Sequence, residues 1–473
     1  MQHPSTYRNR RVVVLGLARS GVSVAKVFHA LGAETIASDV KPPEQCPEAA
    51  ELTALGISVL CGGHPEGLVT PDTALVVKNP GIPYSSPPVR EALELGIEIV
   101  TEVEVAWWLT DAPIIGITGS NGKTTTTTLI GRLLEAAGRK AIVAGNIGRP
   151  LTDAAREAGA DSWLVAELSS FQLKGTSAFR PRISVLTNVA ETHLDYHGGM
   201  DDYTASKAKL FANQTEEDIA VVNWDDPECR RLAEGIRARI VPFAIRQRLE
   251  EGVFVDPPYP PSPEDDGASR TIVRRTGGVS TAIIAVDELG IPGRHNAANA
   301  AAAAAAVLAA GVPAEALAAP LRAFRGVEHR LEFVREKAGI RFYNSSKDTN
   351  PTATTMAIRS VKGPVVLLAG GLDRGSDYAE LVPVLRERVK ALVAIGETRR
   401  KLAEAAEAAG IRHIRVVEPE ASPEATLERA VREADALAEP GDAVLLSPAC
   451  ASWDMFKSYE ERGRIFKKAA HIL

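Results

Sequence analysis

The feature that most constrains the fold is an alternation of short β-branched runs with segments of helical periodicity along almost the whole chain. A Gly-, Pro- or polar-rich loop follows each run, and a 3.6-residue apolar repeat follows the loop. This pattern is typical of α/β proteins, in which helices cover both faces of mostly parallel sheets and ligands bind at the carboxyl ends of the strands. The predicted strands cover residues 11–16, 74–78, 113–118, 162–168, 183–189, 364–371, 391–396 and 442–447.

The length of 473 residues predicts three domains at about 150 residues each. We expect the first domain to run to about residue 109, the second to about residue 325 and the third over the rest of the chain. Between about 245 and 290 the pattern changes to short alternating strands around the low-complexity stretch 256–269. That stretch predicts an exposed loop or a hairpin insertion.

Composition excludes several classes of protein. The net charge of −6 argues against a surface that coats nucleic acid. The four cysteines lie far apart with no C-x-x-C pair, which argues against a disulfide framework or a structural zinc site. The alanine-rich stretch 297–310 is too short and too weakly apolar to span a bilayer. We therefore expect a soluble intracellular protein without membrane insertion.

The strongest local motif is GITGSNGKTT (116–125), which follows an apolar strand and opens a helix. Backbone N–H groups of such a loop bind phosphate oxygens, Lys123 can reach the terminal phosphates and Thr124 can ligate Mg²⁺. The standard spacing places glycine at position 117, where this chain has isoleucine, so the loop is a variant. The alternative is a Gly-rich turn with an exposed lysine.

Glu167, His193 and Asp195 follow neighbouring predicted strands of the same sheet. One carboxylate and one imidazole near the phosphate loop suit a divalent ion that bridges phosphate and substrate oxygens. Alone, each is as readily a cap, an ion-pair partner or a loop residue. From spacing alone, Lys207 and Lys209 are predicted to lie on a solvated helix face.

The N-terminal unit GLARSG (16–21) follows a strand and opens a helix, and Asp39 ends the next strand. It resembles a dinucleotide fingerprint, but Ala18 replaces the glycine that allows close approach to a pyrophosphate. NPGIP (79–83) adds a second loop at the same sheet edge. We expect a nucleotide-like ligand here rather than a conventional NAD site.

The remaining candidates lie in the second half of the chain. Asn296 and Asn299 share a face in the first turn of the alanine-rich helix, where amides read a purine edge or simply cap the helix. His329 and Arg330 are candidates for phosphate binding or a domain-interface ion pair. Three strand-end loops supply cations and hydroxyls suited to a small dianion, NSSKDTN (344–350), GGLDRG (370–375) and SPACAS (447–452). Cys450 is predicted to be a packed residue, because no histidine is placed to activate it.

Together these motifs resemble the ATP-dependent Mur ligases of bacterial cell-wall synthesis. The matches, in chain order, are TGSNGKTTT, ELSSFQL (167–173), NVAETHLD (188–195), GRHNAAN (293–299) and the His329-Arg330 pair. GLARSG, NPGIP, N-x-S-K-x-T-N and LSPACAS-x-D-x-F (446–456) are most similar to the members that add D-glutamate. The resemblance covers essentially the whole chain. It implies a Rossmann-like N-terminal domain over 1–109, a central P-loop ATP-binding domain over 110–325 and a C-terminal Rossmann-like domain over 326–473.

The resemblance implies a cytoplasmic, monomeric ligase that joins D-glutamate to UDP-N-acetylmuramoyl-L-alanine through an acyl phosphate, using ATP and two Mg²⁺ sites. It implies ATP binding by Gly119, Ser120, Asn121, Gly122, Lys123, Thr124, Thr125, Asn296, Asn299, His329 and Arg330. It implies catalytic or metal-binding roles for Lys123, Thr124, Glu167, His193 and Lys207, the last as a carbamylated lysine. It implies UDP-sugar binding by Ser20, Asp39, Asn79, Gly81 and Asn146, and D-glutamate binding by Lys347, Thr349, Arg374, Ser452 and Tyr459.

Two departures from the family pattern and three rival functions remain open. Ser345 stands where the family often has an aspartate near the ATP ribose, and Arg374 stands where some members have lysine. The rivals are a sister or folylpolyglutamate synthase-like ligase, an NAD-dependent oxidoreductase and a noncatalytic nucleotide sensor. The oxidoreductase hypothesis leaves Lys123, Glu167 and His193 unexplained, and substrate-dependent phosphate release separates an enzyme from a sensor.

Overall fold

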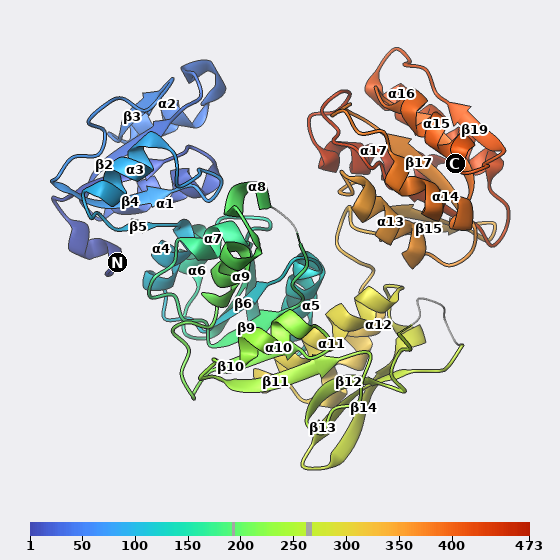
Figure 1. The fold of residues 1–473 in the computed structure, drawn as a ribbon, viewed down its shortest axis with the longest axis horizontal. Coiled ribbons are helices and arrows are strands. Elements are labelled where there is room, and N and C mark those ends of the chain that lie inside the picture. Colours follow the sequence, from blue (N-terminus) through green and yellow to red (C-terminus); the bar gives the residue numbers. More distant parts are fainter. Residues whose placement is uncertain (192–193, 262–266) are drawn as a thin grey trace. The chain divides into compact units, whose positions relative to one another are not determined.

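The computed structural model describes residues 1–191, 194–261 and 267–473 (Figure 1). By contacts the chain divides into two compact units, one of Met1–Val286 with Ala297–Leu321 and one of Asp287–Asn296 with Arg322–Leu473. The first unit holds two sheets and the second holds one. All three sheets are mostly parallel, which confirms the predicted α/β class, while the domain bounds near residues 109 and 325 stay predictions.

The N-terminal sheet is parallel throughout, with strand order β3-β2-β1-β4-β5. Its strands are β1 (Arg11–Leu15), β2 (Glu34–Asp39), β3 (Ser58–Cys61), β4 (Thr73–Lys78) and β5 (Ile99–Val100). Its helices are η1 (Pro4–Tyr7), α1 (Arg19–Ala30), η2 (Pro43–Gln45), α2 (Glu48–Ala54), α3 (Pro87–Glu94) and α4 (Glu102–Trp108). Strand order reverses between β1 and β4, and the loops after those two strands are the predicted GLARSG and NPGIP loops. A ligand crevice is expected at such a switch point.

The central sheet has nine strands in the order β14-β13-β12-β11-β10-β9-β6-β8-β7. The strands are β6 (Ile114–Thr118), β7 (Lys140–Gly145), β8 (Ser162–Glu167), β9 (Ile183–Leu186), β10 (Ile219–Asn223), β11 (Arg239–Ala244), β12 (Gly252–Asp256), β13 (Thr271–Thr276) and β14 (Val279–Ala285). The pairings of β12 with β13 and of β13 with β14 are antiparallel. Residues 262–266 of the low-complexity stretch lie outside the described ranges.

Helices cover this sheet, and α5 packs on β6, β7 and β8. The helices are α5 (Lys123–Ala136), α6 (Leu151–Glu157), α7 (Ser170–Lys174), α8 (Leu194–His197), α9 (Met200–Ala208), α10 (Pro227–Ala233), η3 (Val286–Glu288), α11 (Arg294–Ala309), η4 (Ala314–Ala316) and α12 (Ala318–Ala323). Strand β6 lies between β8 and β9, so the loops after these three strands meet at one sheet edge. The phosphate loop, Glu167 and the 187–191 segment start from that edge.

The sheet of the second unit has the order β15-β16-β20-β17-β18-β19, and only β15 is antiparallel. The strands are β15 (Glu332–Lys337), β16 (Ile340–Asn344), β17 (Val365–Gly370), β18 (Val389–Ile395), β19 (His413–Val416) and β20 (Ala443–Leu446). The helices are α13 (Pro351–Ser360), η5 (Ala379–Leu381), α14 (Val382–Arg388), α15 (Arg399–Ala408), α16 (Pro423–Leu437) and α17 (Tyr459–Ile472). Helices α13, α14 and α15 share one apolar core and α16 and α17 share the other, so both faces of the sheet are covered.

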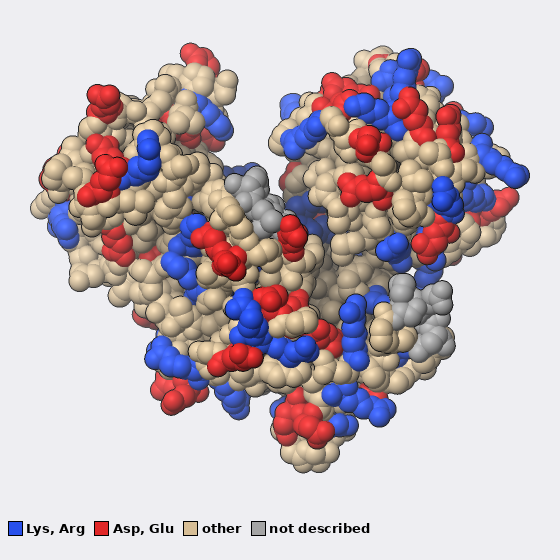
Figure 2. Space-filling model, in the orientation of Figure 1, with Lys and Arg blue, Asp and Glu red and all other residues tan. Residues whose placement is uncertain are grey.

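The surface fits the mild net charge. Figure 2 shows basic and acidic side chains interspersed over the visible face rather than gathered by sign. Within the described ranges, no helix combines the length and apolarity needed to cross a membrane.

Candidate active site

The phosphate loop joins β6 to α5 in the predicted strand–loop–helix order. Gly122 caps the helix with a φ of +80°, a backbone conformation that favours glycine, and the Asn299 side chain of α11 lies beside it, with Oδ1 2.2 Å from where a Cβ would be. Lys123 Nζ donates to the backbone oxygens of Gly119 and Ser120 at 2.8 and 2.9 Å. The loop is therefore formed, with its lysine folded back over it.

The segment after β9 holds the other side of this loop. Asn188 Oδ1 accepts from the Asn121 N–H at 2.9 Å, and Ser120 N–H donates to the Asn188 carbonyl at 2.9 Å. Thr187 Oγ1 donates to the Asn121 carbonyl at 2.7 Å. The segment that follows β9 thus fixes the backbone of the glycine-rich phosphate loop.

Glu167 ends β8, is 2 % exposed and is held by the neighbouring loop GNIG (145–148). The Asn146 side-chain amide donates to Glu167 Oε1 at 2.8 Å, and Asn146 N–H donates to the Glu167 carbonyl at 2.8 Å. A Cβ at Gly145, whose φ is +104°, would lie 2.3 Å from that carbonyl, so the approach needs glycine. Glu167 Oε2 is buried with no hydrogen-bond partner. A buried carboxylate oxygen without a donor suits a cation.

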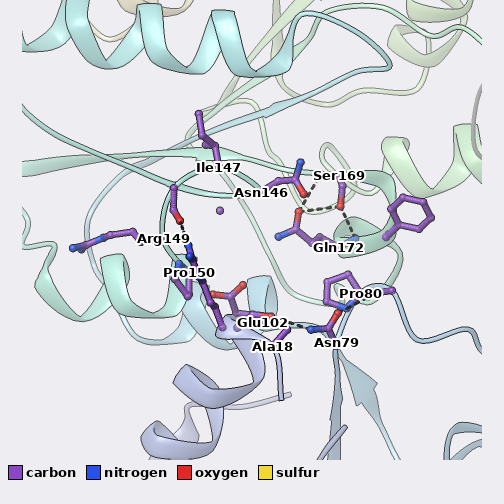
Figure 3. A pocket seen from close by; sticks show the side chains of 16 residues that line it. Ala18, Asn79, Pro80, Glu102, Asn146, Ile147, Arg149, Pro150, Ser169 and Gln172 are labelled. Carbon is purple, nitrogen blue, oxygen red and sulfur yellow. Dashed lines mark hydrogen bonds between the residues drawn. The ribbon is translucent and has the colours of Figure 1, made fainter. Parts of the chain in front are cut away.

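Asn146, which donates to this carboxylate, also lines a pocket of about 430 Å³ (Figure 3). Four of the five residues predicted to hold the UDP sugar line it, namely Ser20, Asn79, Gly81 and Asn146. Figure 3 shows Asn146 beside Ser169 and Gln172, with Asn79 and Pro80 lying together at another wall. The pocket is thus formed by the loops at the switch point of the N-terminal sheet together with loops of the central sheet.

Asp39, the fifth predicted residue, is not among those lining the pocket. It is 8 % exposed, and its Oδ2 accepts from the Leu17 N–H at 2.7 Å while Oδ1 accepts from the Lys41 N–H at 2.9 Å. Its carboxylate therefore fixes the backbone of the GLARSG loop. A ligand role for Asp39 stays a prediction.

Lys207 corrects the prediction of a solvated helix face. It is 1 % exposed, and Lys209 is half-buried with its Nζ donating to the Lys174 and Thr176 carbonyls at 2.7 and 2.8 Å. Helix α9 packs against α7 and buries Tyr203 as well, although its sequence has no apolar stripe. Burial, with Lys123 nearby, places the pKa of the Lys207 ammonium well below its ordinary value.

The predicted ligand His193 lies outside the described residues, and the side chain of Asp195 is not described either. In the described part of the chain, no group of three or more His, Cys, Asp and Glu side chains is placed to hold a metal ion. The described groups that suit Mg²⁺ are the unpartnered Glu167 oxygen and the hydroxyl of Thr124, which is 3 % exposed at the start of α5.

In the second unit, His329 is 3 % exposed and has a φ of +66°. Its Nδ1 accepts from the Asn344 amide at 3.0 Å, and burial lowers its pKa. Arg330 has a buried Nε without a partner, and Asn296 donates to the Pro292 carbonyl at 2.7 Å. These three predicted nucleotide-binding residues are therefore ordered within this unit, while Asn299 lies beside the phosphate loop of the other.

Four of the predicted D-glutamate residues lie in the three loops that follow β16, β17 and β20, which are adjacent strands, and the fifth, Tyr459, opens α17. Lys347 Nζ lies 5.2 Å from the centre of the Tyr459 ring, and the guanidinium of Arg374 lies 5.1 Å from that of Trp453. Ser452 is buried, and Thr349 and Arg374 are exposed. The carbonyl of Tyr459 already accepts from Ser346 Oγ at 2.8 Å.

Two questions from the sequence are settled by burial. Ser345 is 2 % exposed and its Oγ accepts from the Leu331 N–H at 3.0 Å, so its hydroxyl serves the fold. Cys450 is 3 % exposed, within 3.1 and 3.2 Å of the Tyr378 and Thr398 hydroxyls, and burial raises its pKa. The prediction of a packed cysteine is confirmed.

Sequence reasoning missed two buried cations, Lys78 and Arg462, which are 1 % and 0 % exposed. Each donates to backbone oxygens of predicted ligand loops. No motif marks either one. The only available signal was their position, beside NPGIP for Lys78 and shortly after the SPACAS loop for Arg462.

Comparisons with known proteins agree along the whole chain. Family models match residues 10–101 (Mur ligase MurD-like, N-terminal domain), 117–307 (Mur ligase middle domain) and 329–450 (Mur ligase, glutamate ligase domain). The UDP-N-acetylmuramoylalanine–D-glutamate ligase of Geobacillus kaustophilus (strain HTA426) is 48% identical over 468 residues, 99% of this chain and 98% of that protein. The enzyme of the same name from Bacillus subtilis (strain 168) is 44% identical over 474 residues, 100% of both chains.

Solved structures with the same architecture include MurF from Acinetobacter baumannii, with a TM-score of 0.58 and 18% identity over 99% of this chain and 93% of that one. MurC from Thermotoga maritima has a TM-score of 0.57 and 17% identity over 98% and 99%. At such identities the likeness shows the fold alone.

Proposed function

The chain belongs to the Mur ligase family, and on that premise we propose how its own residues carry out the reaction. It is an ATP-dependent ligase that adds D-glutamate to UDP-N-acetylmuramoyl-L-alanine in peptidoglycan synthesis. The physical task is to join a carboxylate to an amine in water, although a carboxylate is a poor electrophile. ATP solves this by converting the carboxylate to an acyl phosphate.

The pocket of about 430 Å³ is the observation that best supports our division of roles. Ser20, Asn79 and Gly81 offer polar groups for the uridine diphosphate on one wall. Asn146, on another wall, is bonded to Glu167. We propose that the sugar nucleotide binds here and directs its terminal carboxylate toward the sheet edge that carries the phosphate loop.

The ATP phosphates are assigned to the loop over 119–125. Its backbone N–H groups and the amino end of α5 favour anions, and Lys123 offsets charge that gathers at the γ-phosphate. Its present acceptors are two loop carbonyls, so phosphate oxygens would replace them. Asn296, Asn299, His329 and Arg330 would hold the rest of the nucleotide.

The residues present fit Mg²⁺, which ATP-dependent ligation implies. Glu167 has a buried oxygen without a donor, and Thr124 opens α5 with a buried hydroxyl. We propose that these two, with His193 and a carbamylated Lys207, hold Mg²⁺ at two sites. When bound, Mg²⁺ would offset negative charge on the phosphate oxygens.

The carbamate on Lys207 is supported by burial and by the absence of an acceptor. Within the described residues, its ammonium contacts only the Tyr203 ring, 4.5 Å from its centre, and carries a lowered pKa. A neutral amine forms a C–N bond to carbon dioxide and releases one proton to water. The product is an anion where an isolated cation would be unfavourable.

The reaction then follows in two steps. The terminal carboxylate of the sugar nucleotide attacks the γ-phosphorus, and the bond to the β,γ-bridging oxygen breaks to release ADP. The amine of D-glutamate, once deprotonated, attacks the acyl carbon, and the tetrahedral intermediate expels phosphate. Lys347, Thr349, Arg374, Ser452 and the backbone of Tyr459 would orient D-glutamate, with Arg374 suited to a carboxylate by its fork of donors.

The decisive experiment measures phosphate release from ATP and Mg²⁺ with UDP-N-acetylmuramoyl-L-alanine while the amino acid is varied. Release should require D-glutamate, with L-glutamate, L-lysine and meso-diaminopimelate inert. If another amino acid is used instead, the chain still belongs to the family, but the assignment of the 344–350, 370–375 and 447–452 loops to D-glutamate is overturned. No release with any of them would overturn the function.

We also propose that the enzyme acts as a cytoplasmic monomer, with domains close to 1–109, 110–325 and 326–473. The three family matches fall inside these ranges, which supports the bounds. Light scattering at assay concentration tests the assembly state.

A further inference from the structure

Arg462 lies on α17 and is fully buried, with 0 % of its surface exposed. A buried cation ordinarily has a carboxylate partner. Arg462 forms no ion pair with any residue of the described ranges, although Asp348 and Asp454 lie near enough to favour its charge. Its charge is instead satisfied by neutral oxygens.

The donors of its guanidinium reach three different loops. Nε donates to Ser346 Oγ at 3.0 Å, and one terminal nitrogen donates to the carbonyls of Ser346 and Cys450 at 2.9 and 3.1 Å. The other terminal nitrogen donates to the Gly370 carbonyl at 3.4 Å. Ser346 and Cys450 follow β16 and β20, and Gly370 is the last residue of β17. These strands are neighbours in the sheet, so one side chain joins three strand ends.

The surroundings hold this arrangement tightly. A Cβ at Gly463, the next residue of α17, would lie 2.1 Å from His329 Nδ1, so the helix backbone is pressed against that histidine. A Cβ at Gly371 would lie 2.2 Å from the Ala451 carbonyl and 3.2 Å from Arg462 itself. Ser346 Oγ also donates to the Tyr459 carbonyl at the start of α17.

Each of these loops carries a residue assigned to D-glutamate. Lys347 follows Ser346, Arg374 lies four residues after Gly370, and Ser452 lies two residues after Cys450. We propose that Arg462 is a positioning residue for D-glutamate, which holds these three loops in register without touching the substrate. The proposal rests on the proposed function.

The test compares Arg462→Met and Arg462→Lys with Arg464→Met, an exposed arginine on the same helix. We expect Arg462→Met to raise the KM for D-glutamate about 10- to 100-fold and to lower the preference for D- over L-glutamate, because small displacements of orienting groups have effects of that size. Lysine keeps the charge but lacks the fork, so Arg462→Lys should resemble the methionine variant. Arg464→Met should behave as wild type.

The KM values for ATP and the sugar nucleotide separate positioning from mere folding. Loss of folded protein lowers kcat for every substrate and leaves KM and stereochemical preference unchanged. A D-glutamate KM within twofold of wild type in folded Arg462→Lys would overturn the proposal. Should Arg462→Met not fold, Ser346→Ala removes one acceptor and should raise the same KM, whereas an unchanged KM would again overturn it.

This design keeps two failures apart. If the wild-type enzyme uses no D-glutamate, the proposed function fails. If it uses D-glutamate and the Arg462 variants bind it normally, only the positioning role fails.

Discussion

Two buried cations, Lys207 in the first unit and Arg462 in the second, have opposite chemical consequences. They are 1 % and 0 % exposed, so burial does not distinguish them. Arg462 donates to four oxygens, whereas the Lys207 ammonium makes no hydrogen bond with the described residues and lies 4.5 Å from the centre of the Tyr203 ring. The pKa of Arg462 falls only to about 10, and that of Lys207 falls well below its ordinary value.

Hydrogen-bond acceptors, rather than burial, therefore distinguish these two cations. With acceptors, Arg462 keeps its charge at neutral pH and holds loops together. Lys207 makes no hydrogen bond with the described residues, and its lowered pKa supports the proposed carbamate. Guanidinium also loses its proton far less readily than ammonium, which suits it to a permanent structural role.

The largest expected effect comes from Lys123→Ala, which removes the phosphate-loop cation and a charge that, after burial, helps to lower the pKa of Lys207. We expect kcat to fall about 10³-fold with the fold intact, as for loss of a charge-stabilising group in other enzymes. Phosphate release measures kcat, and circular dichroism measures whether the fold is intact. Lys140→Ala, at an exposed lysine on β7, is the control, and wild-type turnover in Lys123→Ala would remove that residue from the site.

Lys207 itself provides the next test. Lys207→Ala should lose about 10²-fold in kcat, and short carboxylic acids should restore part of it by supplying an anion in the vacated space. Wild-type activity should fall as pH drops through the pKa of the amine, because only the neutral amine reacts with carbon dioxide. Bicarbonate should raise wild-type activity in carbon dioxide-depleted buffer and leave Lys207→Ala unchanged. Full activity of Lys207→Arg would contradict the carbamate.

Lys78 shares a feature with each of these cations, because it has hydrogen-bond acceptors, as Arg462 has, and is an ammonium with a lowered pKa, as Lys207 is. Its Nζ donates to the Ile82, Pro80 and Asn79 carbonyls at 2.8, 3.3 and 3.4 Å and to the Tyr196 hydroxyl at 3.2 Å. Burial lowers its pKa to about 8. Lys78→Met should relax the NPGIP loop and raise the KM for the sugar nucleotide about fivefold, the equivalent of roughly 1 kcal/mol.

The same loop should respond to pH in the wild-type enzyme. Above about pH 8 the amine of Lys78 loses its proton and donates more weakly, so the KM for the sugar nucleotide should rise there. Lys78→Met should lack that rise. If the KM of Lys78→Met equals that of the wild-type enzyme at every pH, the carbonyls of the NPGIP loop hold their places without the ammonium.

The smallest expected effect is on thermal stability and comes from the buried acid Glu102. Glu102 is 2 % exposed, and burial raises its pKa to about 7 although its Oε1 accepts from the Thr152 N–H at 2.9 Å. Between the unfolded pKa and pH 7 the folded state holds the extra proton, so the stabilisation is present at low pH and is lost as pH rises through 7. Glu102→Gln should raise Tm by about 2–4 °C at pH 8 and by less at pH 5. Equal shifts at both pH values would contradict this.

Much of the fold followed from periodicity. The eight predicted strands correspond to β1, β4, β6, β8, β9, β17, β18 and β20. The strand–loop–helix order of the phosphate loop was readable because its backbone donors, lysine and helix start lie within ten residues. The carboxyl ends of parallel strands share one edge, which is why residues distant in sequence were correctly expected at common edges.

The burial of individual side chains could not be predicted from the sequence in this way. The chain alone determined which residues follow each strand and which loops have the composition to bind phosphate. The tertiary structure decided that α9 is covered, so that Lys207 is buried rather than solvated, and that Asp39 turns to the Leu17 backbone. It also decided that Arg462 spans three loops. A motif carries its chemistry in neighbouring residues, whereas burial and the acceptors around a charge depend on what packs over it from elsewhere in the chain.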